Sequence, residues 1–160
     1  MDFLSPEEYY KSLPKKQVGA GVLLFNSKGE LLIVKPTYKD KWSIPGGSVD
    51  AEESPKTCAI RETKEEIGLD LKDVQFICVD YKKTKDVQPE NMQFIFYGGI
   101  ITEKEIKKIK LEKDELGEFR FISVEKNLDL LRPNFKKRLP HCLEAIKTGK
   151  TIYLEEGEIK

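Results

Sequence analysis

The chain has 160 residues, a length typical of one domain, and contains equal numbers of basic (28) and acidic (28) residues. This zero net charge gives no electrostatic basis for binding long nucleic acid or a membrane surface, and no stretch approaches the roughly 20 apolar residues of a membrane span. The N-terminus lacks the apolar core of a secretory signal, and the three cysteines (Cys58, Cys78 and Cys142) show no metal-binding spacing. We therefore expect a cytoplasmic protein with reduced, buried cysteines.

The first part of the chain predicts two strands joined by a turn. Residues 1–16 are interpreted as a peripheral lead-in, helical or irregular. The apolar run at residues 17–25 predicts a buried strand, and residues 31–34 predict a second one. Because residues 26–29 are turn formers, we expect the two strands to pair as a hairpin.

Three lysines (Lys35, Lys39 and Lys41) lie in the polar loop that follows, at residues 35–41. Loop lysines are either solvated or bind a phosphate as a point charge. We keep all three as candidate substrate contacts. Trp42, the only tryptophan, is expected to pack in the core rather than to stack on a base.

The most clearly defined element is a helix that carries its own start and stop signals. Gly46 and Gly47 give a tight loop the backbone freedom it needs. Ser54 is a good N-cap, and Pro55 suits the first helical position. Gly68 predicts the left-handed residue that ends the helix.

Three carboxylates share one face of this helix, because residues three and four apart are neighbours: Glu62, Glu65 and Glu66. Like charges on one face repel, so either solvent or a bound divalent cation must offset the repulsion. The buried side carries Ala59, Ile60, Thr63 and Ile67. A defined packing side and an adjacent Gly-Gly loop favour a magnesium site over a solvated surface.

The second half of the chain predicts further strands and a C-terminal helix. The expected elements are strands at 74–81 and 92–101, an exposed segment at 102–113, a short strand at 119–122, a helix start after Ser123, a helix from Pro133 to Ile146 with a break or kink at Pro140, and an edge strand in the peripheral tail at 150–160. One face of the strand at 92–101 must meet the core. The other face packs on a helix or holds a nucleobase, for which Phe94 and Phe96 are the candidates. This alternation predicts an α/β fold with a mixed β-sheet between helices.

The spacing of residues in the loop and helix resembles the signature box of the Nudix hydrolases. The matching residues are Gly47, Glu53, Arg61, Glu62, Glu65, Glu66, Ile67, Gly68 and Leu69. Thr63 departs from the pattern, since the family prefers a bulky aliphatic residue there, but this changes the buried side and no carboxylate. The resemblance implies a single Nudix domain over residues 1–160, folded as an α/β/α sandwich.

The resemblance also implies a metal site. Mg²⁺ or Mn²⁺ would be bound by Glu62, Glu65 and Glu66 together with the backbone carbonyl of Gly46. In such enzymes an arginine and a glutamate orient the ligands through a salt bridge. Those residues are Arg61 and Glu53 in this chain.

One further carboxylate is expected from a distant loop that precedes an aromatic strand. By the resemblance, Glu115 is the first candidate, with Glu112 and Glu118 as rivals. Glu115 and Glu65 are both open as the general base that activates water.

The implied reaction is metal-dependent hydrolysis of a diphosphate linkage in a nucleoside diphosphate joined to a group X, by in-line attack of water. The group X is left open among nucleoside triphosphates, dinucleoside polyphosphates and nucleotide sugars. The alternatives are a catalytically silent nucleotide-binding module and a pyrophosphohydrolase of 5′-phosphorylated RNA ends. The expected partner is a small nucleotide rather than nucleic acid, and a homodimer formed through the edge strand is left open.

Overall fold

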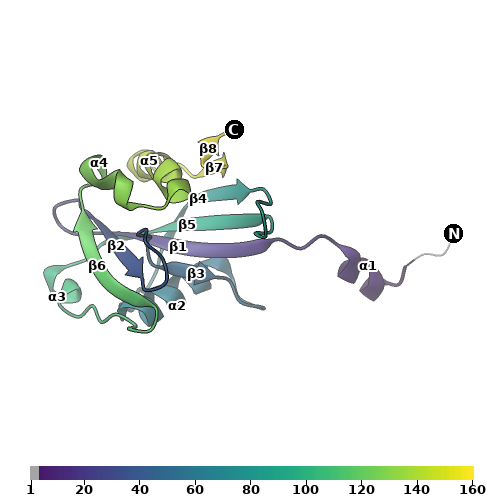
Figure 1. Cartoon of the computed structure of the whole chain (residues 1–160), viewed down its shortest axis with the longest axis horizontal. Coiled ribbons are helices and arrows are strands. Elements are labelled where there is room, and N and C mark those ends of the chain that lie inside the picture. The colour runs from purple at the N-terminus through teal and green to yellow at the C-terminus, as the bar shows by residue number, and fades with distance from the viewer. Residues whose placement is uncertain (1–3) are drawn as a thin grey trace.

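The structure, a computed structural model, describes residues 4–160 and has a mixed β-sheet of eight strands at its centre (Figure 1). The strands are β1 (Gln17–Phe25), β2 (Leu31–Pro36), β3 (Gly46–Ser48), β4 (Gln75–Lys82), β5 (Asn91–Ile100), β6 (Leu116–Ile122), β7 (Ile152–Glu155) and β8 (Glu158–Ile159). The helices are α1 (Pro6–Ser12), α2 (Pro55–Ile67), α3 (Glu103–Ile106), α4 (Val124–Asn127) and α5 (Pro133–Thr148), with a 3₁₀ turn at Leu128–Leu130. Helices α2 and α5 cover opposite faces of the sheet, which confirms the expected α/β/α sandwich.

The strand order is β6-β2-β1-β5-β4-β7-β8, and β3 pairs with β1 outside this path. Strands β1 and β5 are parallel, as are β4 and β7, while the other pairs are antiparallel. The predicted hairpin of β1 and β2 exists, but these strands are in register only at Phe25 and Leu31. They diverge because β3, which the sequence did not predict as a strand, pairs with β1 at residues 19–21.

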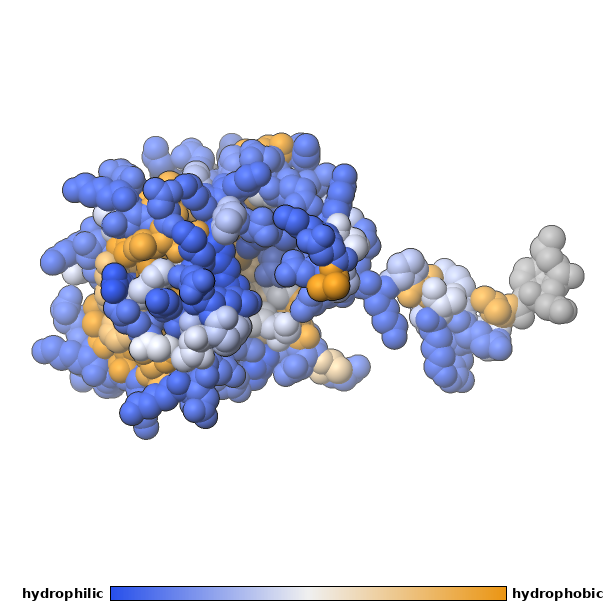
Figure 2. All heavy atoms as spheres, viewed as in Figure 1, coloured by the Kyte–Doolittle hydropathy of each residue, from blue (hydrophilic) through white to orange (hydrophobic). Residues whose placement is uncertain are grey.

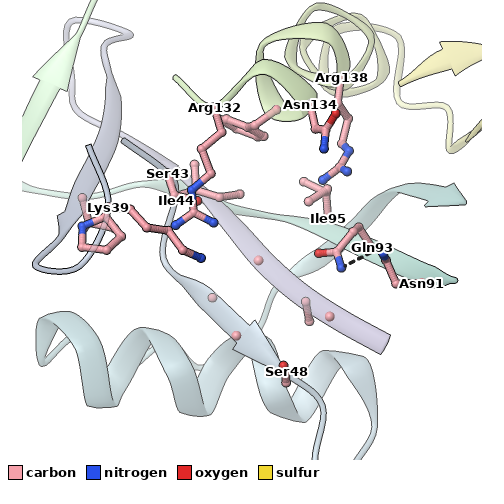
Figure 3. Close-up of a pocket in the computed structure, with 18 of the residues that line it drawn as sticks. Lys39, Ser43, Ile44, Ser48, Asn91, Gln93, Ile95, Arg132, Asn134 and Arg138 are labelled. Atoms are coloured by element: carbon pink, nitrogen blue, oxygen red, sulfur yellow. Dashed lines mark hydrogen bonds between the residues drawn. The ribbon is translucent and has the colours of Figure 1, made fainter. Parts of the chain in front are cut away.

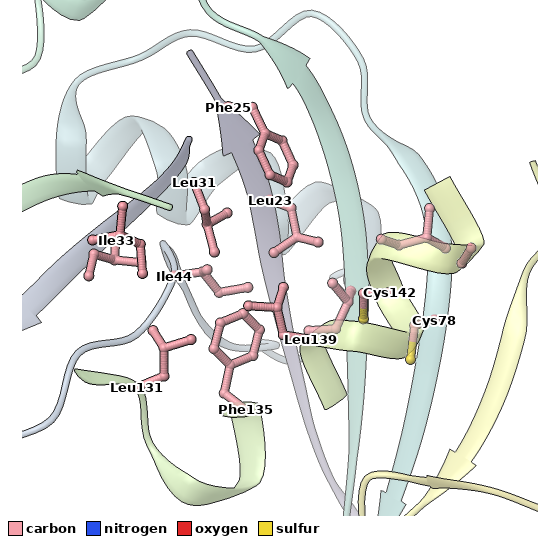
Figure 4. Packing of buried hydrophobic residues seen from close by; sticks show 14 of the residues in the cluster. Leu23, Phe25, Leu31, Ile33, Ile44, Cys78, Leu131, Phe135, Leu139 and Cys142 are labelled. Atoms are coloured by element: carbon pink, nitrogen blue, oxygen red, sulfur yellow. The ribbon is translucent and has the colours of Figure 1, made fainter. Parts of the chain in front are cut away.

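The core has two layers because consecutive residues of β1 and β2 face opposite sides of the sheet. On the α5 side, Leu23 and Leu31 pack with Phe135 and Leu139 (Figure 4). On the α2 side, the buried residues include Leu24, Leu32, Ile67 and Phe96. Trp42 is 5% exposed in the α5 layer, so its expected packing role is confirmed.

Helix α2 has the boundaries that its sequence signals predict. The Ser54 side chain accepts a hydrogen bond from the backbone N–H of Thr57, and Pro55 is the first helical residue. Gly68 ends the helix in the left-handed conformation. The three cysteines are free and buried, as expected.

Two expectations about the second half are wrong. Helix α5 continues through Pro140, so the expected break is absent, while a kink there stays a prediction. Lys136, whose carbonyl loses its N–H partner to Pro140, is exposed to water. The segment at 102–113 is not uniformly exposed, because Ile106, Ile109 and Leu111 pack against the α2 layer. Strand β6 also begins three residues earlier than predicted.

The end of the chain forms the expected edge of the sheet. Strand β7 pairs with β4, and β8 adds a short antiparallel partner. No helix formed by residues 4–160 is long and apolar enough to cross a membrane. Hydrophilic residues dominate the face shown in Figure 2, in line with the charged composition.

Candidate active site

Strand β3 and the glycine loop it forms ahead of α2 allow only glycine at two positions. Gly46 has φ of +150°, and a Cβ atom there would lie 2.2 Å from the carbonyl oxygen of Ala20. A Cβ atom on Gly47 would lie 2.4 Å from the carboxyl group of Glu62. The two glycines therefore let the loop backbone approach both β1 and the acidic face of α2.

Glu66 is the most perturbed carboxylate of this face. It is 8% exposed and accepts a hydrogen bond of 2.8 Å from the backbone N–H of Gly46. Burial raises the pKa of Glu66 to about 8, and the nearby Glu62 and Glu115 carboxylates add to this effect. The Gly46 N–H and the positive charge of Arg132 act in the opposite direction. A buried acid with so few compensating charges is the kind of group that a cation would stabilise.

Arg61 holds the other carboxylates in place. Its guanidinium donates to both oxygens of Glu53, at 2.8 and 2.9 Å, and to Glu62 at 2.8 Å and Glu65 at 2.9 Å. The hydrogen bonds from Arg61 lower the pKa of Glu53 to about 2. The structure thus brings together Arg61 and Glu53, the two residues expected to orient the ligands. Glu65 is exposed, whereas the side chain of Glu62 is 15% exposed and lies against Gly47.

Glu115 comes from a distant segment but reaches the same site. The backbone N–H of Glu112 donates to the carbonyl of Glu66, and the N–H of Thr37 donates to the carbonyl of Glu115. These bonds fasten the segment to α2 and β2. Glu115 is exposed and lines the same cavity as Glu66.

The two rival carboxylates lie elsewhere. Glu118 is in β6, where it forms an exposed ion pair with Arg120. Glu112 is exposed and does not line the cavity. The backbone of Glu112 is bonded to Glu66, but of the three candidates only Glu115 lines the cavity together with Glu66.

Within the part of the chain that the structure describes, no three His, Cys, Asp or Glu side chains converge on a ready-made cation site. The cause is visible in the contacts, because Arg61 draws Glu62 and Glu65 toward itself. The donor set still suits a hard divalent cation, since Glu62, Glu66 and Glu115 are neighbouring oxygen donors and burial raises the pKa values of Glu62 and Glu66.

A cavity of about 630 Å³ lies beside these carboxylates, between the sheet and the N-terminal end of α5 (Figure 3). Glu66, Glu115 and the glycine loop line its acidic end. The start of α5 contributes Arg132, Asn134 and Arg138. The volume is within the range of small-molecule sites.

Comparison with known proteins identifies the family. The NUDIX domain model matches residues 15–144, which is most of the chain. The chain belongs to the Nudix hydrolase family. The resemblance seen in the glycine loop and α2 is thereby confirmed.

Solved structures share this Nudix fold. The MutT protein of Methanosarcina mazei is 24% identical, with a TM-score of 0.66 over 88% of this chain and 100% of that one. A UDP-X diphosphatase is 17% identical, with a TM-score of 0.71 over 95% of this chain and 76% of that one. At these identities the likeness shows the fold alone.

Two curated relatives are named for reactions on RNA. The mRNA-decapping enzyme subunit 2 of Saccharomyces cerevisiae is 32% identical over 127 residues, which is 76% of this chain but 12% of that protein. The RNA pyrophosphohydrolase of Hydrogenovibrio crunogenus is 38% identical over 66 residues, 41% of this chain and 38% of that one. The chain therefore spans only a minor part of both relatives.

The structure separates the candidate substrate contacts of this Nudix chain. Lys39 lines the cavity next to Arg132 (Figure 3), and burial lowers its pKa, with a further contribution from Arg132. Lys41 instead donates to the carbonyl of Asp129, outside the cavity. Lys35 is half-buried in β2 and does not line the cavity either.

Phe94 and Phe96 are not brought to the cavity. Both side chains pack with the α2 layer, where Phe76 contacts each ring. The alternate residues of β5, Gln93 and Ile95, face α5 and line the cavity. The alternation is as predicted, but the face of β5 that meets the cavity carries Gln93 and Ile95 and not the candidates Phe94 and Phe96.

Arg132 is a site residue that sequence reasoning missed. It is the N-cap of α5 and lines the cavity, and its Nε atom is buried without a hydrogen-bond partner in the described structure. Its influence on the pKa values of Lys39 and Glu66 places it between the lysine and the acidic end. The available signal was an arginine immediately before Pro133, the proline that starts the helix.

Replacing Gly47 by Ala is expected to lower metal-dependent activity about 10–100-fold without unfolding the Nudix domain, because the new Cβ atom must displace the Glu62 carboxyl group. Steady-state kinetics and thermal unfolding of the same samples check this. Gly117→Ala is the matched control, since its Cβ atom would meet nothing closer than 3.9 Å. Equal activity in the two variants would show that Glu62 can move without consequence.

Proposed function

We propose that this chain hydrolyses a diphosphate linkage in a nucleoside diphosphate joined to a group X, using Mg²⁺ or Mn²⁺. The observation that carries the proposal is Glu66, a buried carboxylate with a raised pKa at the acidic end of a nucleotide-sized cavity. Glu62, Glu65, Glu66, Glu115 and the carbonyl of Gly46 are the proposed metal ligands. When bound, the metal would neutralise phosphate charge and lower the pKa of a bound water.

The protein's own groups divide the remaining work. Lys39 and Arg132 line the cavity, and the charge of Arg132 acts on Glu66, so the two cations would hold the phosphates. Arg61 and Glu53 fix the position of Glu62 and so act as positioning residues.

Glu115 is the proposed general base. It lines the cavity, it is exposed, and no arginine is bonded to it in the described residues, so it can accept a proton from the attacking water. Glu65 is a weaker candidate because the guanidinium of Arg61 already binds its carboxylate.

Glu115→Gln is therefore expected to lower the turnover rate by about 10²–10⁴-fold while the KM for substrate changes little. The matched control is Glu118→Gln, because Glu118 makes only an exposed ion pair outside the cavity. Steady-state kinetics with Mg²⁺ measure both variants. A loss below about tenfold for Glu115→Gln would remove it as the base.

The substrate class is tested with a panel in Mg²⁺ and in chelator, following release of phosphate, pyrophosphate and nucleoside monophosphate. The panel contains nucleoside triphosphates, nucleotide sugars, dinucleoside polyphosphates and a 5′-triphosphorylated RNA. Metal-dependent cleavage of one class supports the proposal and names X. Tight nucleotide binding without cleavage would favour a silent binding module instead.

A second candidate is a pyrophosphohydrolase of 5′-phosphorylated RNA ends. It is favoured by the names of the curated relatives, an mRNA-decapping enzyme and RNA pyrophosphohydrolases. The zero net charge that spoke against nucleic acid does not exclude a single RNA end, because two basic side chains, Lys39 and Arg132, line the cavity. The RNA in the panel decides between the two candidates.

A further inference from the structure

A lysine without a partner lines the cavity far from the acidic end. Lys82 is the last residue of β4 and is only 9% exposed. Among residues 4–160 its ammonium group takes part in no hydrogen bond or ion pair. Most of the side chain is thus buried, while its ammonium group stays accessible from the cavity and can bind an external anion there.

The acids near Lys82 are already engaged. Asp80 is fully buried and accepts two hydrogen bonds from Arg138, at 2.9 and 2.6 Å, and a third from the N–H of Gly157. Glu156 accepts from the N–H of Lys83 at 2.7 Å. Burial lowers the pKa of Lys82 to about 8, and the positive charge of Arg138 adds to this effect. The nearby acids, Asp80 and Glu156, are thus bonded to other groups, so an external anion can pair with Lys82.

The start of α5 supplies further donors in the same cavity. Arg132, the N-cap, makes no side-chain capping bond, and Pro133 has no N–H to offer. The backbone N–H groups of Asn134 and Phe135 thus have no side-chain cap, and both residues line the cavity. The N-terminus of a 16-residue helix also favours negative charge.

Strand register shows how far this basic corner lies from the carboxylates. Gly46 pairs with Gly21 of β1, which pairs with Ile95 of β5. Lys82 pairs with Asn91, four residues away from Ile95 along β5. The path from β3 to β4 crosses three strand spacings, and the path from Ile95 to Asn91 covers four residues of β5. The backbones of Gly46 and Lys82 are therefore separated by a distance on the order of 20 Å. A polyphosphate group alone does not cover this span, whereas a nucleoside with phosphates on both sides fits between the two ends.

The middle of the cavity suits a nucleoside. Gln93 lies between the two ends along β5 and donates at 3.1 Å to Asn91, the register partner of Lys82 (Figure 3). Gly19 makes room for this pair, since a Cβ atom there would lie 2.7 Å from the Gln93 amide. Amide side chains recognise the hydrogen-bonding edges of bases without adding charge.

We propose that Lys82 and the first turn of α5 form a second anion subsite, which binds a phosphate on the 3′ side of the substrate's nucleoside. This inference rests on the proposed function, because it takes the Glu66 end as the place of the scissile diphosphate. The preferred substrate class is then a nucleoside 5′-polyphosphate that carries a 3′-phosphate. That phosphate is either a monoester on a free nucleotide or the first phosphodiester of an RNA chain.

The kinetic test compares three substrates with the same nucleoside: the 5′-triphosphate, its 3′-phosphorylated form and the triphosphorylated dinucleotide. The wild-type kcat/KM is expected to be at least about tenfold higher for the 3′-phosphorylated substrates, with a preference that weakens as salt rises. Lys82→Met loses this preference but keeps the rate on the plain triphosphate. Lys83→Met, at the exposed neighbouring lysine, keeps both.

The two sources of the 3′-phosphate are separated by the same data. A preference for the monoester alone indicates a free nucleotide, and a preference for the dinucleotide indicates an RNA end. Equal rates on all three substrates in the wild type, or a preference that survives in Lys82→Met, would overturn the subsite.

A binding measurement keeps the subsite testable if no substrate is hydrolysed. Calorimetry in the absence of metal compares a nucleoside 5′-diphosphate with its 3′-phosphorylated form, and thermal unfolding shows that each variant is folded. The 3′-phosphate is expected to tighten wild-type binding at least about tenfold and to have no effect in Lys82→Met. Absent hydrolysis with this pattern contradicts the proposed function but supports the subsite, whereas equal affinities in the wild type contradict the subsite.

Discussion

Glu66→Gln is expected to lower metal-dependent hydrolysis by about 10²–10⁴-fold, a loss in the same range as that predicted for Glu115→Gln. Glutamine keeps the size of Glu66 and can still accept the 2.8 Å hydrogen bond from Gly46. What it removes is the carboxylate charge of a buried acid at the end of the cavity. Steady-state kinetics with Mg²⁺ measure the loss, and Glu118→Gln is the control at an exposed acid outside the cavity.

The same substitution is expected to stabilise the metal-free protein at alkaline pH. The pKa of Glu66 is raised to about 8 in the folded state, above the ordinary value of 4.5 that applies in the unfolded chain. Between these values the unfolded chain binds fewer protons than the folded one, so the wild-type free energy of unfolding falls as pH rises from about 4.5 to 8. Glu66→Gln lacks this decline.

Denaturant unfolding in chelator at pH 5 and pH 8 tests the stability prediction. Glu66→Gln should exceed the wild type at pH 8 by an amount on the order of a few kcal/mol, and the difference should shrink at pH 5. Added Mg²⁺ should stabilise the wild type and not the variant. An equal pH response in both proteins would contradict the assignment of Glu66 as a strained, buried acid.

Asp80→Asn is expected to lower the free energy of unfolding by about 3–5 kcal/mol, the largest stability loss we predict. Asp80 is 0% and Arg138 is 5% exposed, and the arginine makes two hydrogen bonds to one oxygen of Asp80. The substitution keeps the shape of the side chain but leaves the guanidinium charge buried and uncompensated. It also weakens the acceptor for the N–H of Gly157, which joins the β7–β8 hairpin to β4.

The matched control for Asp80→Asn is Glu118→Gln, which breaks the exposed pair with Arg120. That change should lower the free energy of unfolding by less than about 1 kcal/mol, because solvent screens the pair. Urea denaturation at pH 7 measures both variants. Similar small losses in the two would show that the buried pair contributes no more than a surface one.

The sequence predicted the parts of this site that depend on local signals. Helix α2 could be located to the residue because its N-cap, its first proline and its terminal glycine lie within the helix or next to it. The spacing of four residues between Glu62 and Glu66 also predicted that they share one face of this helix. Strand β3 could not be located this way, since Gly46–Ser48 has no strand propensity and becomes a strand only through pairing with β1.

Tertiary structure decided the remaining assignments. Phe94 and Gln93 lie on opposite faces of a strand buried on both sides, so hydrophobicity alone could not show which face meets the cavity. Glu112, Glu115 and Glu118 are equally polar in sequence. Only the hydrogen bonds that fasten their segment to α2 and β2 place Glu115, and not its rivals, at the cavity. Lys82 ends β4 beside a polar loop and is largely buried in the folded chain, near the charges of Arg138 in α5 and Glu156 in the tail.

Binding of Mn²⁺ tests the central claim, that the acidic end of the cavity acts through a divalent cation. Electron paramagnetic resonance of free Mn²⁺ gives the dissociation constant for the wild type, Glu66→Gln and Glu118→Gln without the need for a substrate. We predict saturable binding by the wild type and by Glu118→Gln, and a dissociation constant at least about tenfold higher for Glu66→Gln. Binding that is equal in the wild type and Glu66→Gln, or absent from the wild type, would contradict the account.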